Sequence, residues 1–163
     1  MTNRSKLLVM QPRDRLHTVL ITRTWELAEF LDDIASVEFI EQETIDTRSR
    51  SASHVWRAKA TVPPLLAPHM NIDHFKWTAT VRWNDDDYES RWRIEPHALR
   101  QTLSCDGIVT LSEAVGGRGT RVAIDTNIDG LNDQQGVETI AYRIVLVNWQ
   151  KLVEAAVRRL ESD

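Results

Sequence analysis

The sequence predicts an α+β fold in which a curved antiparallel sheet of about six to seven strands wraps around one long C-terminal helix. The stretch from Val137 to Leu160 carries apolar residues at helical spacing over many turns, so we expect a helix from Gln135 to Leu160. The middle of the chain alternates apolar and polar residues with a period of two, as half-buried strands do. Because so wide an apolar stripe must lie against something large, we expect the helix to pack on the sheet, with space for a ligand between them.

A first strand and two short helices are expected before the main run of strands. Lys6–Met10 is a short apolar run that Gln11–Pro12 ends, and proline suits a helix entry. A first helix with an apolar face follows, and Thr24 is a plausible cap for the second. The apolar residues of the two helices are Leu16, Val19 and Leu20, then Trp25, Leu27, Ala28, Phe30 and Leu31.

The alternating segments predict the strands and the turns between them. The clearest strand is Phe75–Trp83, and Asn84–Asp87 is the turn that joins it to the next strand in a hairpin. Gly116–Gly119 is expected to join the last two strands. The other expected strand segments are Val37–Ile45, Val55–Val62, Tyr88–Ile94, Leu99–Ala114 and Thr120–Ile128.

Prolines end one of these strands early. Pro63, Pro64 and Pro68 follow Val55–Val62 and force an irregular connection. The loop Leu65–Met70 is itself apolar, so we expect it to form a mouth or lid over the ligand space rather than to lie entirely in solvent.

Length and composition suit one domain over residues 1–163. A chain of 163 residues can bury about two thirds of its unfolded surface, and its single cysteine, Cys105, cannot form an internal disulfide. The N-terminus lacks the apolar core of a signal peptide, so we expect a cytoplasmic protein. No segment is long and apolar enough for stable membrane insertion.

Charge argues against a nucleic-acid or anionic-membrane partner, because the net charge is −4 and such binders concentrate positive charge. Arg48–Arg57 and Arg82–Arg93 are local arginine-bearing stretches within the alternating segments, where the charges fall on the outward face. We favour a solvated face for these arginines, and a phosphate site is the alternative.

Several segments together resemble the START-like (SRPBCC) superfamily, also called the helix-grip fold. Its members include polyketide cyclases, birch-pollen-type allergens, coenzyme Q-binding proteins and lipid-transfer domains. The resemblance implies the fold and a cavity, and it carries over no catalytic set, because the superfamily has no universal one. The segments that carry it are Gln11-Pro12 leading into Leu16, Trp25–Phe30 followed by Ser36-Val37-Glu38, Trp92-Arg93-Ile94, Gly107, and Gly117-Arg118-Gly119-Thr120-Arg121-Val122.

Candidate ligand-binding residues lie on the inward, apolar sides of the predicted strands and helix. Aromatic rings make good walls for a flat or apolar ligand, and a few hydroxyls and one imidazole would orient it. Packing of the core is the alternative role for each of them. The candidates are Trp56, Trp77, Trp92, Tyr88, Ser90, His54, Thr126 and Ile144, and Trp83 shares the same side.

Binding of a small hydrophobic or amphipathic molecule is therefore the favoured function, and a polyketide cyclase or aromatase is the alternative. In the enzyme, Tyr88, Ser90 or His54 would polarise a ketone. No cofactor is expected. No metal is expected either, because His69, Asp73 and His74 lack a fourth ligand. A homodimer through an exposed strand edge stays open.

Overall fold

The computed structural model describes residues 2–32, 34–59, 76–97, 103–130 and 135–162, with side chains described at all of these except 96, 103, 104, 130 and 135–147. The chain begins with strand β1 (Thr2–Val9), helix α1 (Arg13–Leu20) and the 3-10 helix η1 (Thr24–Phe30). The elements that follow are β2 (Ile34–Thr44), β3 (Ser49–Ala58), β4 (Lys76–Asn84), β5 (Glu89–Pro96), β6 (Leu103–Ala114), the 3-10 turn η4 (Val115–Gly117), β7 (Gly119–Gly130) and α2 (Gln135–Glu161).

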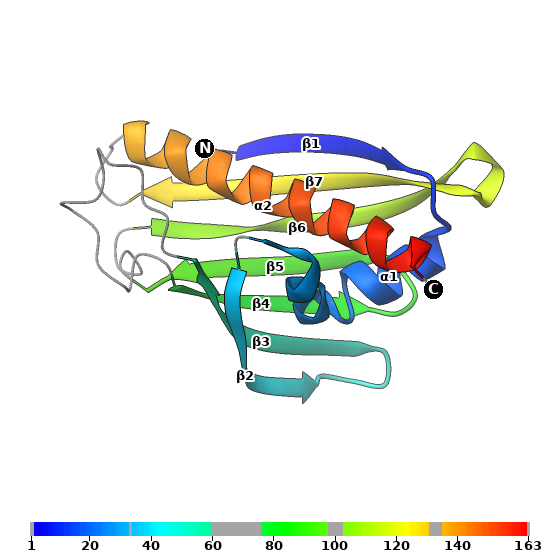
Figure 1. The fold of residues 1–163 in the computed structure, drawn as a ribbon, viewed down its shortest axis with the longest axis horizontal. Coiled ribbons are helices and arrows are strands. Elements are labelled where there is room, and N and C mark those ends of the chain that lie inside the picture. Colours follow the sequence, from blue (N-terminus) through cyan, green and yellow to red (C-terminus); the bar gives the residue numbers. More distant parts are fainter. Residues whose placement is uncertain (1, 33, 60–75, 98–102, 131–134, 163) are drawn as a thin grey trace.

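Seven strands form one antiparallel sheet in the order β1-β7-β6-β5-β4-β3-β2, so that β1 and β2 are its edges. Helix α2 runs obliquely across one face of the sheet, and α1 and η1 lie on that same side (Figure 1). The predicted fold class is therefore confirmed: a curved antiparallel sheet holds a long C-terminal helix that starts at Gln135.

The period-two pattern holds because only one face of the sheet is covered. Residues that alternate along β6 and β7 point toward the helices and are fully buried, while their chain neighbours face outward. The core joins these residues to the apolar stripes of α1 and α2. Its members include Leu16, Leu20, Ile21, Leu27, Val109, Leu111, Val122, Ile124, Ile128, Trp149, Val153, Ala156 and Leu160.

Two local expectations differ from the structure. The first strand begins at Thr2 rather than Lys6, because the polar stretch Thr2–Ser5 pairs with Ile124–Asn127 of β7 and needs no apolar pattern of its own. Thr24 does not cap the second helix. Its hydroxyl donates backwards to the carbonyls of Leu20 and Ile21, at 2.5 and 2.9 Å, and so satisfies acceptors at the end of α1.

Strand bounds differ elsewhere as well. Strand β3 starts at Ser49 rather than Val55, and it pairs with β2 on one side and β4 on the other. The expected apolar lid Leu65–Met70, the residues His69, Asp73 and His74, and the strand start at Phe75 lie outside the described residues.

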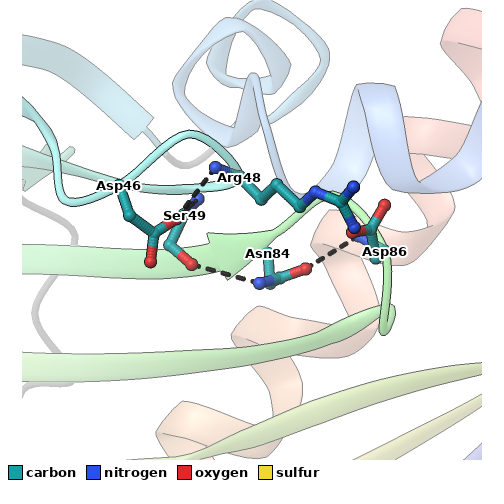
Figure 2. A network of polar contacts seen from close by, with 5 residues as sticks. All are labelled: Asp46, Arg48, Ser49, Asn84 and Asp86. Carbon is teal, nitrogen blue, oxygen red and sulfur yellow. Dashed lines mark hydrogen bonds and ion pairs between the residues drawn. The ribbon is translucent and has the colours of Figure 1, made fainter.

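A polar network ties the β2–β3 turn to the β4–β5 turn (Figure 2). The Asp46 carboxylate accepts hydrogen bonds from the backbone N–H groups of Arg48 and Ser49, both at 2.8 Å. The Asn84 amide donates to the Ser49 hydroxyl at 3.1 Å, and the Arg48 guanidinium pairs with Asp86. These bonds hold the two hairpins side by side at one end of the sheet.

Gly107 lies where β6 passes under the indole of Trp92, its partner across the strands. A Cβ atom at this position would overlap the carbonyl oxygen of Asp125 and lie 2.5 Å from Cζ2 of Trp92. Only glycine leaves room for the ring this close to the strand, which is one reason for a glycine inside a sheet. The position of Trp92 therefore depends on residue 107 having no side chain.

We expect Gly107→Ala to cost about 3 kcal/mol or more, because the added methyl group must displace the Trp92 ring or the β7 backbone. Gly117→Ala is the control, since Gly117 has open space around it and its positive φ of 85° alone costs about 1 to 2 kcal/mol. Urea unfolding and near-ultraviolet circular dichroism measure both effects. Equal losses and unchanged aromatic spectra in the two variants would contradict this account.

Candidate functional site

A pocket opens between the inner face of β3–β5, the 3-10 helix η1 and the middle of α2. It has an empty volume of about 700 Å³, the solvent at its mouth included. Its walls are mostly apolar. The lining residues are Thr24, Trp25, Leu31, Ile34, Ala52, His54, Trp56, Trp77, Ala79, Thr80, Val81, Trp92, Arg93, Ile94, Asn148, Trp149, Lys151 and Leu152.

Two pairs of tryptophans form opposite parts of the wall. Trp56 and Trp77 face each other across β3 and β4, and their rings stack with centroids 6.3 Å apart and planes 10° apart. Trp92 of β5 meets Trp149 of α2 with centroids 5.8 Å apart and planes tilted by 51°. The second pair joins the sheet to the helix, and the first stands toward the β2 edge of the sheet.

His54 is the buried imidazole of the pocket. Its ring stacks on Trp25 of η1, with centroids 4.3 Å apart, and the ring of Phe39 approaches edge-on at 5.6 Å. Burial lowers the pKa of His54 below its ordinary value of 6.5, because the apolar surroundings disfavour the charged form. The neutral ring has one donor and one acceptor nitrogen, so it can serve a hydroxyl or a carbonyl group.

Other polar groups in the wall are few. The Thr80 hydroxyl is bonded to Ser53 at 2.9 Å, Arg93 pairs with Glu95, and Thr24 already donates to the end of α1. Asn148 and Lys151 come from α2. The indole Nε1 of Trp92 is buried and has no hydrogen-bond partner in the described part of the chain. Such a wall can bury an apolar body and orient it with a small number of hydrogen bonds.

The sequence-based candidates divide into two groups. Trp56, Trp77, Trp92 and His54 line this pocket, whereas Tyr88, Ser90 and Thr126 do not. The side chain of Ile144 lies outside the described residues.

The prediction had missed two residues that line the pocket. Trp25 and Trp149 come from η1 and α2. The apolar stripes of these helices included them, but helical spacing alone does not tell which part of a stripe faces a cavity.

Tyr88 belongs to a different cluster, at the end of the sheet that α1 covers. Its hydroxyl donates to the Asp14 carboxylate at 2.6 Å, and this bond raises the pKa of Tyr88. The guanidinium of Arg13 lies 4.0 Å from the centre of the tyrosine ring. His17 meets the same ring edge-on, with centroids 5.1 Å apart. The tyrosine is thus engaged by side chains of α1.

Ser90 and Thr126 are buried, at 1% and 2% exposed. Ser90 sits opposite Trp83 across β4 and β5, and its hydroxyl has no partner among the described residues. Thr126 sits opposite Gly107 across β6 and β7. Both therefore belong to the packed inner face rather than to the pocket wall.

The thiol of Cys105 is buried, and burial raises its pKa to about 12. Because the thiolate is the reactive form, this cysteine is a packing residue rather than a nucleophile. Within the described residues, no group of three or more histidine, cysteine or acidic side chains could hold a metal ion. None of the helices described has the length and apolar character needed to cross a membrane.

Comparison with solved structures finds this architecture in proteins of low sequence identity. TTHA0849 from Thermus thermophilus matches with a TM-score of 0.69 and 16% identity, over 99% of this chain and 98% of that one. Ara h 8.0201 matches with a TM-score of 0.72 and 14% identity, over 100% and 99%. The Zhui aromatase/cyclase from Streptomyces sp. R1128 matches with a TM-score of 0.69 and 12% identity, over 98% and 95%.

The chain therefore has the helix-grip fold, as its sequence resemblance implied. No protein-family model matches the sequence, and no curated protein matches it. At these identities the likeness defines the fold and leaves the chemistry of the pocket to be argued from its own residues.

We expect acid to destabilise the protein partly through His17. This residue is 5% exposed, both of its ring nitrogens lack partners in the described part of the chain, and burial lowers its pKa below 6.5 despite Asp14, Asp85 and Asp87. Well above pH 6.5 the ring is neutral in both states and adds no pH dependence. Below that pH the unfolded chain takes up the proton first, so stability falls by up to about 1.4 kcal/mol per pH unit.

His17→Gln should reduce this fall, as measured by urea unfolding at about pH 7.5 and 5.5. His54, whose pKa is also lowered by burial, would supply the remaining dependence of the same sign. The matched control is His97→Gln, because His97 is only half-buried and bonds to Thr78 at the far end of β5. An unchanged slope in His17→Gln would contradict the assignment.

Proposed function

We propose that the protein binds a small hydrophobic or amphipathic molecule in the pocket between β3–β5, η1 and α2. The observation that carries the proposal is a largely apolar pocket with five tryptophans in its wall: Trp25, Trp56, Trp77, Trp92 and Trp149. Apolar burial contributes about 25 cal/mol per Å², so each part of the indole surface that a ligand covers adds to its affinity.

The wall also indicates the kind of molecule. Rings with parallel planes, as in the Trp56–Trp77 pair, offer a flat surface to an aromatic or alicyclic ligand. The imidazole of His54 and the polar end groups on α2 would meet one or two oxygens of the ligand. A mainly apolar molecule with a few oxygens fits these walls better than a highly charged one.

A direct test is native mass spectrometry of the protein purified from its own host, followed by denaturation and analysis of any released molecule. A defined small-molecule adduct of apolar character would support the proposal and identify the ligand class. Repeated absence of an adduct, together with no binding of any apolar dye to the folded protein, would count against it.

We expect Trp77→Ala to weaken binding of the dye 1-anilinonaphthalene-8-sulfonate by about tenfold or more, because the indole surface that the dye covers is lost. Trp77 is half-buried, so its loss should cost less stability than that of a core tryptophan. Trp83→Ala is the matched control: Trp83 lies on the same side of β4, is 3% exposed and does not line the pocket. Its loss should cost about 3 to 5 kcal/mol.

Trp77→Ala should therefore lose more dye affinity than Trp83→Ala in fluorescence titration, and it should lose less stability in urea unfolding. Equal losses of affinity and stability in Trp77→Ala would indicate that the Trp56–Trp77 pair is part of the core. Dye affinity that falls in Trp83→Ala at a temperature where it is folded would place the dye elsewhere on the inner face.

A second candidate is a cyclase-type enzyme, and His54 is the observation that favours it. Of the three residues considered as proton donors or acceptors, only His54 lines the pocket, and it is held between aromatic rings with a lowered pKa. One of the structural matches with this fold is an aromatase/cyclase. A neutral, buried imidazole is suited to general acid–base work near neutral pH.

His54→Gln separates the two candidates, because glutamine keeps a donor and an acceptor but cannot transfer a proton at neutral pH. A binding protein should keep dye affinity within a few fold. An enzyme assayed with a linear poly-β-ketone should lose turnover by about a hundredfold or more. No turnover in the unaltered protein would remove the enzyme candidate.

A further inference from the structure

The outer face of the sheet, opposite the pocket, places two arginines directly against each other. Arg82 of β4 and Arg91 of β5 are partners across the strands. Their chain neighbours Trp83 and Trp92 are buried on the inner face, so both arginines project outward, and both are exposed. Only the strand register shows this juxtaposition, since it depends on the exact length of the turn between the two strands.

Two like charges directly opposite each other destabilise a sheet. Cross-strand partners have Cβ atoms about 4.5 to 5.5 Å apart, so the two guanidinium groups can reach a common point above the strands. Because the repulsion between the two arginines destabilises the sheet, a negative charge bound between them would stabilise it.

The surrounding carboxylates do not supply that charge. Arg93, the next arginine on the same face, pairs with Glu95 at 3.0 Å, and Arg4 pairs with Asp125 at 3.3 Å. Within the described residues, neither Arg82 nor Arg91 forms an ion pair or a hydrogen bond.

Two further carboxylates lie close by. Asp46 is within electrostatic reach of Arg82, but its carboxylate is held by the N–H groups of Arg48 and Ser49. Glu89 lies two positions from Arg91 on the same side of β5 and forms no ion pair with it. The two guanidinium groups therefore keep their donors available.

Hydroxyl groups border the pair on the β3 side. Ser51 is the partner of Arg82 across β3 and β4, and it is half-buried. In the adjacent row, the hydroxyls of Ser53 and Thr80 bond to each other at 2.9 Å. Two guanidinium forks beside a serine hydroxyl form a site rich in hydrogen-bond donors.

We propose that Arg82 and Arg91 form a binding site for a phosphate-type dianion on the outer face of the sheet. Guanidinium groups bind phosphate through paired, charge-assisted hydrogen bonds, and a dianion between them replaces repulsion with attraction. The ligand is either free phosphate or the phosphate monoester of a larger molecule such as a lipid headgroup. This site does not depend on the pocket, because the sheet separates the two.

The test compares thermal unfolding in phosphate with that in chloride at equal, low ionic strength. We expect phosphate to raise the unfolding temperature of the unaltered protein, because a ligand that binds only the folded state stabilises it. Arg82→Gln and Arg91→Gln should each abolish this rise. In chloride alone, each should unfold at the same or a higher temperature than the unaltered protein, because the repulsion is gone.

The matched control is Arg121→Gln, which removes an exposed arginine of the same outer face on β7, where its partners are Ser112 and Leu8. This variant should keep the full response to phosphate. A phosphate response that is absent from the unaltered protein, or that is equal in all three variants, would overturn the proposal for free phosphate.

Vesicles distinguish the two sources of the anion. Phosphatidylcholine vesicles with and without phosphatidic acid are sedimented with the protein. Retention only on phosphatidic acid, lost in Arg82→Gln and kept in Arg121→Gln, would identify a lipid phosphate as the ligand. A response to inorganic phosphate alone would identify the free anion. The site is refuted if neither form responds in an Arg82- and Arg91-dependent way.

Discussion

The contact of Trp92 with the main chain at Gly107 is the constraint on which the inner face of this protein depends. A cross-strand glycine lets the indole lie close to the main chain of β6, and Trp149 of α2 packs against that ring with centroids 5.8 Å apart. The centre of the sheet is thereby joined to the middle of the long helix at one point. The helix cannot approach the sheet more closely there, and the space toward β3 and β4 stays open as the pocket.

On either side of this contact the same inner face behaves differently. Toward the end covered by α1 the side chains pack into the core, and Leu16, Leu20 and Ile124 are fully buried. Toward β2 the wall consists of large rings on both strands, and these rings cannot interdigitate as branched side chains do. The same alternation of apolar and polar residues thus gives a packed region and a pocket on one inner face. The size and shape of the apolar side chains decide which of the two forms.

The two faces of the sheet also differ in electrostatics. The inner face holds imidazoles at positions 17 and 54 whose pKa values are lowered by burial, so it favours uncharged groups. The outer face carries arginines and carboxylates in adjacent rows, and it includes the pair Arg4–Asp125 across two strands and the pair Arg93–Glu95 along one strand. The proposed apolar ligand and the proposed anion would therefore occupy opposite faces of the sheet, and the β-strands between them keep the two environments apart.

The sequence by itself determined the fold class, because burial on one face of a sheet imposes a period of two and burial of one helix side imposes a period near 3.6. It also determined that Trp56, Trp77, Trp92 and His54 share the inner side. Tertiary structure alone decided that Tyr88 is bound by Asp14 of α1 and that Trp25 and Trp149 complete the pocket wall. It alone set Arg82 opposite Arg91. Alternation tells which face a residue occupies, whereas its neighbours depend on strand register and on which helix covers which end of the sheet.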